Sequence, residues 1–236
     1  DAHLAASFIN GFGALGSLSA ARHVLDVARE ADLASTIVRN AYLRACGRNM
    51  SLARGKHEGR VRAHAIAEAR AVVGGMEGAD RSRAPVDGFT CSLVAGVLPL
   101  AEAAGVVERA GDAADTVAYN ALIDAAGKHG DLPMALSILR RMEEGRGPAP
   151  DEASYNSTLA ALARSPEEQK WRRQGQGRGS AKRAGSAAAA LGNAEDELRA
   201  STAPVSEALD RVAEAMSLRE QMAQRGIEES DVTRST

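Results

Sequence analysis

The residues best suited to chemistry in this chain are its two cysteines and five histidines. Cys46 and Cys91 lack the CxxC spacing of a zinc site or redox pair, and neither lies at ligand spacing from a histidine. The sequence also lacks the HExxH pattern of metalloproteases and the Gly-x-Ser-x-Gly turn of hydrolases. We therefore expect the protein to be no enzyme and to require no metal, cofactor or small-molecule substrate.

A glycine-rich stretch, Gly11-Phe-Gly13-Ala-Leu-Gly16, has the spacing of a dinucleotide-binding turn. That turn must follow a β-strand and open a helix, because the helix N-terminus binds the pyrophosphate. Residues 2–10 instead show helical apolar spacing and contain one β-branched residue. We therefore expect Gly13 and Gly16 to lie at the end of a helix and in the turn that follows it.

The composition indicates which elements must position any functional side chain. Of 236 residues, 49 are alanine and seven are aromatic, and the formal net charge is −2. Alanine, leucine, arginine and glutamate favour helices, so the chain is expected to be mostly α-helical. No stretch approaches the roughly 20 apolar residues of a membrane span, so no membrane partner is expected. Binding to nucleic acid would have to come from local patches.

Internal repeats organise the sequence. Tyr119-Asn120 and Tyr155-Asn156 lie 36 residues apart, within the period range of helical-hairpin arrays. Apolar residues recur at helical spacing on both sides of Gly130-Asp131, which predicts two helices joined by a tight turn. Residues 1–21 superpose on the segment from residue 115 onward without a gap, and residues 36–48 superpose on residues 116–128. Several degenerate copies of one helical hairpin are therefore expected.

These residues resemble a pentatricopeptide repeat (PPR). The matching positions are the Tyr-Asn of the first helix, the Leu122-Ile123 that follows, the Gly130-x-Leu132 turn, the Ala135-Leu136 of the second helix and the closing Pro150-Asp151. The repeats are similar to the PPR region of organellar RNA-processing proteins, including that of protein-only ribonuclease P. The resemblance implies an all-α fold, an α-solenoid of stacked antiparallel helical hairpins.

The repeat register divides the chain into three regions. We expect PPR-like repeats over residues 1–164, a low-complexity basic insertion at residues 165–205, and the second helix of the fifth unit with the start of the next at residues 206–236. The units are expected near residues 2–35, 36–87, 88–115 (a short unit) and 116–151, with a fifth starting at 152. A further basic insertion, near residues 49–64 of the second unit, is expected to place His57 and His64 in a solvated loop, with the second helix following at residues 69–76.

The larger insertion is strongly basic at its start. Residues 170–183 carry six positive charges and no negative one, among glycine, serine, glutamine and alanine. Such a composition cannot bury a core, so the segment is expected to be disordered and solvated. The alternative is an electrostatic arm that contacts RNA phosphates. Trp171 is expected to cap a helix end, although it could also stack on a base.

The resemblance also implies which residues contact RNA. In PPR proteins the first helices line a groove for single-stranded RNA, and two positions per unit choose the base, while an apolar side chain near the helix start packs against it. An Asn amide offers both a donor and an acceptor, and a carboxylate can orient that amide. Carried over to this sequence, the implied residues are Asn40 with Asp87 and Ile37, Ser92 with Asp115 and Phe89, Asn120 with Asp151 and Val117, and Asn156 with Asp231. The first unit, with Ala6 and Ser35 at the paired positions, is assigned no base.

The expected function follows from the resemblance. It implies a sequence-preferring single-stranded RNA-binding protein of mitochondria or plastids that acts in RNA processing, stability or translation, with other RNA-processing proteins as partners. Asn with Asp implies uracil and Ser with Asp implies guanine, so units two to five would select U, G, U and U. The alternative is a helical-repeat scaffold that docks on an assembly such as an organellar ribosome. A positive groove with Asn and Asp at regular spacing would favour RNA, and an apolar groove would favour a protein.

Overall fold

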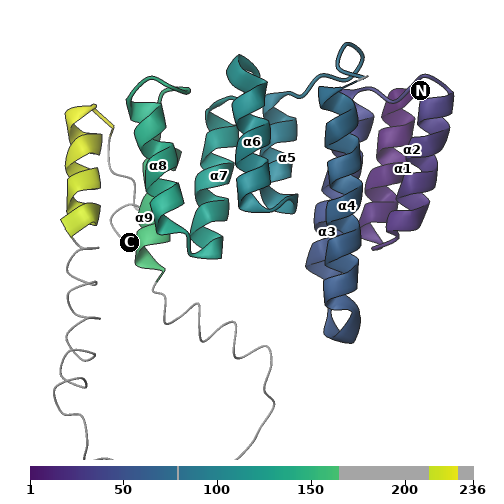
Figure 1. The fold of residues 1–236 in the computed structure, drawn as a ribbon, viewed down its shortest axis with the longest axis horizontal. Helices are drawn as coiled ribbons and strands as arrows, with labels where there is room; N and C mark the ends of the chain where they lie inside the picture. Colours follow the sequence, from purple (N-terminus) through teal and green to yellow (C-terminus); the bar gives the residue numbers. More distant parts are fainter. Residues whose placement is uncertain (79, 165–212, 228–236) are drawn as a thin grey trace, which may run out of the picture.

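The structure is a computed structural model, and it describes residues 1–78, 80–164 and 213–227. These residues form α-helices joined by turns, and none of them lies in a β-strand. The helices stand side by side in chain order and form an elongated array of antiparallel hairpins (Figure 1). The prediction of an all-α solenoid of helical hairpins is confirmed.

Each hairpin has a first and a second helix. The first helices are α1 (Ala2–Ala14), α3 (Thr36–Leu52), α5 (Gly88–Val97), α7 (Thr116–His129) and α9 (Glu152–Ala163). The second helices are α2 (Leu18–Glu30), α4 (Glu58–Glu77), α6 (Leu100–Ala110) and α8 (Leu132–Glu143). Two short 3-10 helices, η1 (Gly55–His57) and η2 (Gly111–Ala113), precede α4 and follow α6. A further helix at residues 213–224 packs Leu218 and Met222 against the same core.

Aspartate residues define where the first helices begin. Asp1, Asp87, Asp115 and Asp151 are N-caps, and the carboxylate of each accepts a hydrogen bond from a backbone N–H in the first turn. Such caps satisfy donors that have no partner within the helix. The residue that closes one unit is therefore also the cap of the next unit's first helix.

Consecutive first helices pack together in chain order, α1 on α3, α3 on α5, α5 on α7 and α7 on α9. Three of these contacts use a glycine in the C-terminal half of a first helix. A Cβ atom on Gly13 would lie 2.7 Å from the Ala45 Cβ, and one on Gly127 would lie 2.8 Å from the Ala161 Cβ. A Cβ on Gly47 would lie 3.3 Å from a Val97 methyl group. Glycine costs about 1 kcal/mol relative to alanine within a helix, and here it permits this close approach.

Gly11, Gly13 and Gly16 lie where the helical interpretation places them. Gly11 and Gly13 are inside α1, and Gly16 follows it in a turn with φ of +72°. The segment before Gly11 is helical, so the strand that a dinucleotide-binding turn requires is not formed there.

The expected loop near residues 49–64 is wrong, because this segment is mostly helical. The helix α3 continues to Leu52, and α4 begins at Glu58, well before the expected start at residue 69. His64 therefore lies on α4 rather than in a loop. Alanine, arginine and glutamate dominate the start of α4, and Arg62 forms an i,i+4 ion pair of 3.0 Å with Glu58, which supports the extra turns. Figure 1 shows that α3 and α4 extend beyond their neighbours.

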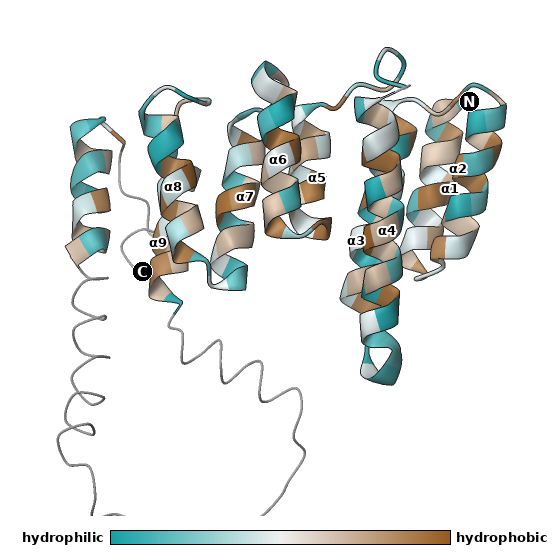
Figure 2. Cartoon of the chain, in the orientation of Figure 1, coloured by the Kyte–Doolittle hydropathy of each residue, from teal (hydrophilic) through white to brown (hydrophobic). Residues whose placement is uncertain are grey.

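The second helices α2, α6 and α8 are amphipathic, and hydrophobic and hydrophilic residues are interspersed along the array (Figure 2). Ion pairs join successive second helices: Arg22 to Glu68, Arg70 to Glu102 at 2.6 Å, Arg109 to Glu77 at 2.9 Å, and Arg141 to Glu108 at 3.2 Å. The second helices therefore form a layer held by Arg–Glu contacts across the unit boundaries.

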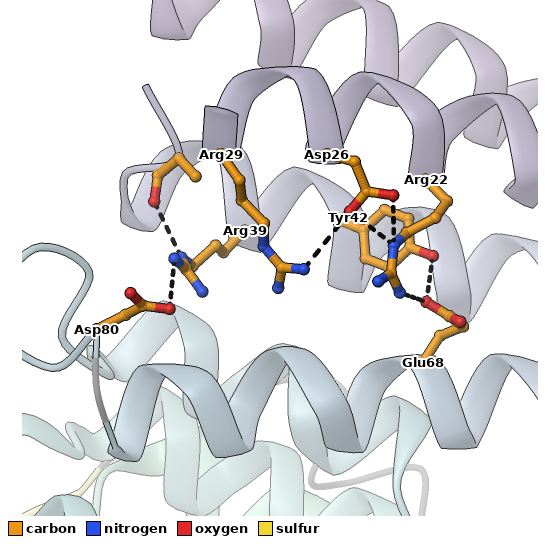
Figure 3. A network of polar contacts seen from close by, with 8 residues as sticks. Arg22, Asp26, Arg29, Arg39, Tyr42, Glu68 and Asp80 are labelled. Atoms are coloured by element: carbon orange, nitrogen blue, oxygen red, sulfur yellow. Dashed lines mark hydrogen bonds and ion pairs between the residues drawn. The ribbon is translucent and has the colours of Figure 1, made fainter. Parts of the chain in front are cut away.

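The boundary between the first and second hairpins shows how this polar layer reaches the core (Figure 3). The Glu68 carboxylate accepts hydrogen bonds from Arg22 and, at 2.8 Å, from the buried Tyr42 hydroxyl. Arg39 is 3% exposed and occupies the register of Tyr119 and Tyr155; it donates to the Ala34 carbonyl at 2.9 Å and pairs with Asp80 at 2.8 Å. These bonds offset part of the cost of burying the arginine charge, while Nη1 of Arg39 is buried without a hydrogen-bond partner among the described residues.

Candidate nucleic-acid interface

Two of the implied Asn–Asp pairs are joined by hydrogen bonds. Asn40 Nδ2 lies 3.3 Å from Asp87 Oδ1, and Asn120 Nδ2 lies 3.0 Å from Asp151 Oδ1. In both cases the asparagine is on a first helix and the aspartate caps the first helix of the next unit. Each pair therefore bridges the boundary between two repeats.

A hydroxyl group completes each pair. Three residues after the aspartate, the Thr90 hydroxyl lies 2.8 Å from Asn40 Oδ1, and the Ser154 hydroxyl lies 2.6 Å from Asn120 Oδ1. The same residues donate their backbone N–H to the aspartate carboxylates, at 2.7 Å for Thr90 and 2.9 Å for Ser154. Sequence reasoning missed these hydroxyls. Their signal was the capping-box spacing Asp-x-x-Thr/Ser, which a search for N-caps detects.

The hydrogen bonds also act on the Asp151 carboxylate. Partial burial disfavours its charge, but the hydrogen bonds from Asn120 and Ser154 outweigh this effect and lower the pKa of Asp151. The carboxylate therefore remains ionised at neutral pH and acts only as an acceptor, which requires the nitrogen of the Asn120 amide to face it.

The boundary between the third and fourth units is built differently. The Ser92 hydroxyl donates to the Gly88 carbonyl of its own helix at 3.1 Å, and Asp115 accepts from the Ala118 N–H at 2.9 Å. Among the hydrogen bonds of the described residues, none joins Ser92 to Asp115. The structure thus places both residues at the boundary but does not link them.

The two remaining units, the fifth and the first, show no linked Asn–Asp pair among the described residues. The Asn156 amide lies 3.2 Å from the Glu152 carboxylate on its own helix. Its implied partner, Asp231, lies outside the described residues, as do the basic insertion and Trp171. In the first unit Ala6 is buried, and no asparagine occupies the paired position.

The three implied apolar contacts are exposed. Ile37 is 49% exposed, Phe89 48% and Val117 62%. A pocket of about 260 Å³ lies between Ile37 and Phe89, and Asn40 and Asp87 also line it. The structure therefore gathers four of the implied residues around one cavity.

Arg44 is a further residue of this pocket that sequence reasoning missed. Its guanidinium lies 5.1 Å from the centroid of the Phe89 ring, a cation–π arrangement. The two residues belong to different units, so the spacing along the chain gave no signal of the contact. Arg44 adds positive charge beside the Asn40–Asp87 pair.

The described residues present no metal-binding cluster, no reactive cysteine and no membrane-spanning helix. They contain no group of three or more His, Cys, Asp or Glu side chains placed to hold a metal ion. Both cysteines are buried, and burial raises the pKa of Cys46 to about 12 and that of Cys91 to about 11, which suppresses the reactive thiolate. Within the described ranges, no helix is both long and apolar enough to cross a membrane.

Comparison with known proteins identifies one segment. Residues 114–164 match the model of the PPR repeat family. The match spans α7, α8 and α9 and contains the Asn120–Asp151 pair together with Ser154. No curated protein matches the chain in sequence.

Proposed function

Because the chain carries a pentatricopeptide repeat, we propose that it binds single-stranded RNA with a base preference. In this proposal it acts in the processing, stability or translation of RNA in mitochondria or plastids, as the resemblance implies. The chain is a binding protein rather than an enzyme, and any chemistry on the RNA comes from partner proteins.

The pocket between α1, α3 and α5 carries this proposal. It combines two exposed apolar side chains, Ile37 and Phe89, with the polar pair Asn40 and Asp87. At about 260 Å³ it is smaller than the roughly 300–1,000 Å³ sites of drug-sized ligands. Apolar walls and one polar edge are what an unstacked nucleobase requires, because its faces are apolar and its edge forms hydrogen bonds.

Affinity and preference would come from different groups. Contacts with the apolar walls contribute about 1–3 kcal/mol per base and tolerate any base. The Asn amide supplies the preference, since it offers a donor and an acceptor to the base edge. Arg44 adds a charge that attracts phosphate without reading sequence.

A panel of labelled RNAs tests the proposal. The purified chain should bind single-stranded RNA containing UGUU more tightly than an equal length of AAAA, and more tightly than the same sequence as a duplex. Enrichment from a randomised RNA pool gives an independent measure of the preferred bases. Equal affinity for all these RNAs, or no binding at low salt, would overturn the proposal.

One observation favours the alternative, a protein-interaction scaffold. Leu4 and Phe8 on α1 are more than half exposed, whereas Ala118 and Leu122, at the same register of α7, are buried. This apolar face suits contact with a protein. The variant Leu4→Ser/Phe8→Ser separates the two functions, because RNA binding in the groove should be unchanged. If the wild type binds no RNA, the scaffold function is favoured instead.

A further inference from the structure

We infer that the hydroxyl groups of Thr90 and Ser154 are positioning groups that make their repeats distinguish uracil from cytosine. This inference rests on the proposed RNA-binding function. Both residues lie three positions after the closing aspartate, and both contact the asparagine of the preceding unit. Both residues are fully buried.

The contacts at the fourth unit define the donors and acceptors. Asp151 accepts only, so the Asn120 nitrogen must face it, at 3.0 Å. The Ser154 oxygen accepts from the Asp151 N–H at 3.1 Å, and its single proton has two possible acceptors. Asn120 Oδ1 at 2.6 Å is nearer than Asp151 Oδ1 at 3.0 Å. The amide is therefore held at both ends, by the carboxylate at nitrogen and by the hydroxyl at oxygen.

Holding both ends fixes what the amide offers to a base. One N–H of Nδ2 and one lone pair of Oδ1 remain, in a fixed order along the amide edge. Uracil presents an N–H between two carbonyl oxygens, whereas cytosine presents an amino group next to a ring nitrogen acceptor. The two pyrimidines thus differ in the order of donors and acceptors. The carboxylate alone sets which end of the amide is the nitrogen but leaves the amide plane free to tilt. An amide held at both ends keeps its free donor and acceptor in one position, which suits one pyrimidine.

The boundary between α5 and α7 supports this role. There the register of Thr90 and Ser154 is occupied by Ala118, which has no hydroxyl. Asp115 still caps its helix, so capping alone does not create the link across the boundary. The hydroxyl is present at the two boundaries where the asparagine is held and absent where the paired residues are not joined.

The second unit should show a weaker effect than the fourth. The Thr90 hydroxyl lies 2.6 Å from Asp87 Oδ1 and 2.8 Å from Asn40 Oδ1, so its proton is shared more with the carboxylate. The Ser154 hydroxyl lies closer to the amide than to the carboxylate. The fourth unit is therefore the more sensitive place to measure the contribution of the hydroxyl.

The experiment measures the ratio of the affinities for uracil and cytosine at two positions of the RNA, those read by the second and the fourth unit. Three labelled RNAs are identical except for their core, UGUU, UGCU or CGUU, so that cytosine replaces uracil at the fourth unit or at the second. Affinities are measured by fluorescence anisotropy for the wild type, Ser154→Ala and Ser154→Thr. Ser154→Ala should lower the uracil-to-cytosine affinity ratio at the fourth unit by about threefold to tenfold, the worth of one neutral hydrogen bond. It should leave the ratio at the second unit unchanged, and Ser154→Thr should keep both ratios.

The variants Thr90→Val and Ser154→Thr test whether the hydroxyl groups have a purely structural role. Thr90→Val keeps the shape of the side chain and should lower the ratio at the second unit alone. A loss of affinity for all three RNAs without a change in either ratio would show that Ser154 only stabilises the fold, and would overturn the inference. An unchanged ratio in Ser154→Ala, or an equal loss in Ser154→Thr, would also overturn it. If the wild type binds none of the RNAs, it is the proposed function that fails.

Discussion

The boundary between α7 and α9 and the boundary between α5 and α7 use one aspartate position in two ways. Asp151 caps α9 and also accepts from Asn120, whereas Asp115 caps α7 and is not joined to Ser92. Two side chains account for the difference, because Asn120 reaches across the boundary and Ser154 anchors it there. A capped helix therefore does not suffice to build a hydrogen-bonded pair across a repeat boundary. The pair also requires a long polar side chain on one unit and a hydroxyl on the next.

Removing the aspartates should produce the largest effects on stability. Asp151→Ala loses an N-cap and leaves the Asn120 amide without its acceptor, so it should lower the free energy of unfolding by about 2 kcal/mol. Asp115→Ala loses only a cap and should cost about 1 kcal/mol. Urea denaturation followed by circular dichroism measures both. Equal losses would show that the bond between Asn120 and Asp151 contributes nothing to stability.

Exchanging the residue types at positions 120 and 92 should exchange the base preferences of the fourth and third units. Asn120→Thr should shift the fourth unit from uracil toward guanine by about tenfold in relative affinity, while the helix content stays unchanged. In the reverse direction, Ser92→Asn with Ala118→Ser supplies the third boundary with both missing groups and should shift it from guanine toward uracil. Binding to RNAs that vary at one position measures each shift. The single variant Ser92→Asn is the control, because it lacks the anchoring hydroxyl and should shift less.

Acid should weaken the α7/α9 boundary. The folded state lowers the pKa of Asp151, so the carboxylate stabilises the fold above its unfolded pKa, near 4. This contribution is lost as the pH falls below about 4 toward the folded pKa, where the group takes up a proton. Thermal unfolding between pH 7 and pH 3 should therefore show a smaller acid-induced drop in Tm for Asp151→Asn, which keeps a capping side chain and does not titrate. An identical drop in both proteins would contradict the assignment.

The smallest effect is expected at Arg44. Arg44→Ala should weaken RNA binding modestly and reduce the slope of log affinity against log salt by about 0.7, the contribution of one phosphate contact to a single strand. Base preference should not change, because a charge does not read the base edge. Arg81→Ala removes the same charge from an exposed loop and is the matched control. The slope is measured from titrations at several salt concentrations, and an equal change in both variants would assign no specific contact to Arg44.

The repeat pattern predicted the fold well, because it depends on local spacing. Tyr119-Asn120, the Gly130 turn and the closing Asp151 determine a helix, a turn and a cap within 36 residues. The start of α4 was missed, since Gly55 and the surrounding charges indicate a loop, while the helix-forming residues after Glu58 prevail.

The candidate site could be predicted only in part. Asn40 and Asp87 were found because the resemblance names their register. The contact of Thr90 with Asn40 joins residues 50 positions apart, and that of Arg44 with Phe89 spans an insertion whose path the sequence does not define. Contacts of this kind depend on how two units are stacked, and spacing within one unit does not reveal it.

Glycines in the C-terminal halves of three first helices permit the close approach of consecutive first helices. Gly13, Gly47 and Gly127 contact the next first helix in the C-terminal halves of the helices, while the Asn–Asp pairs lie toward the N-terminal ends. The short α5 ends at Val97, and its equivalent position is Pro99 rather than glycine. A helix that pivots about such a contact moves its far end, so the distance between successive Asn–Asp pairs depends on residues that do not line the pocket. Under the proposed RNA binding, the rise per nucleotide would thus depend on glycines that do not line the pocket.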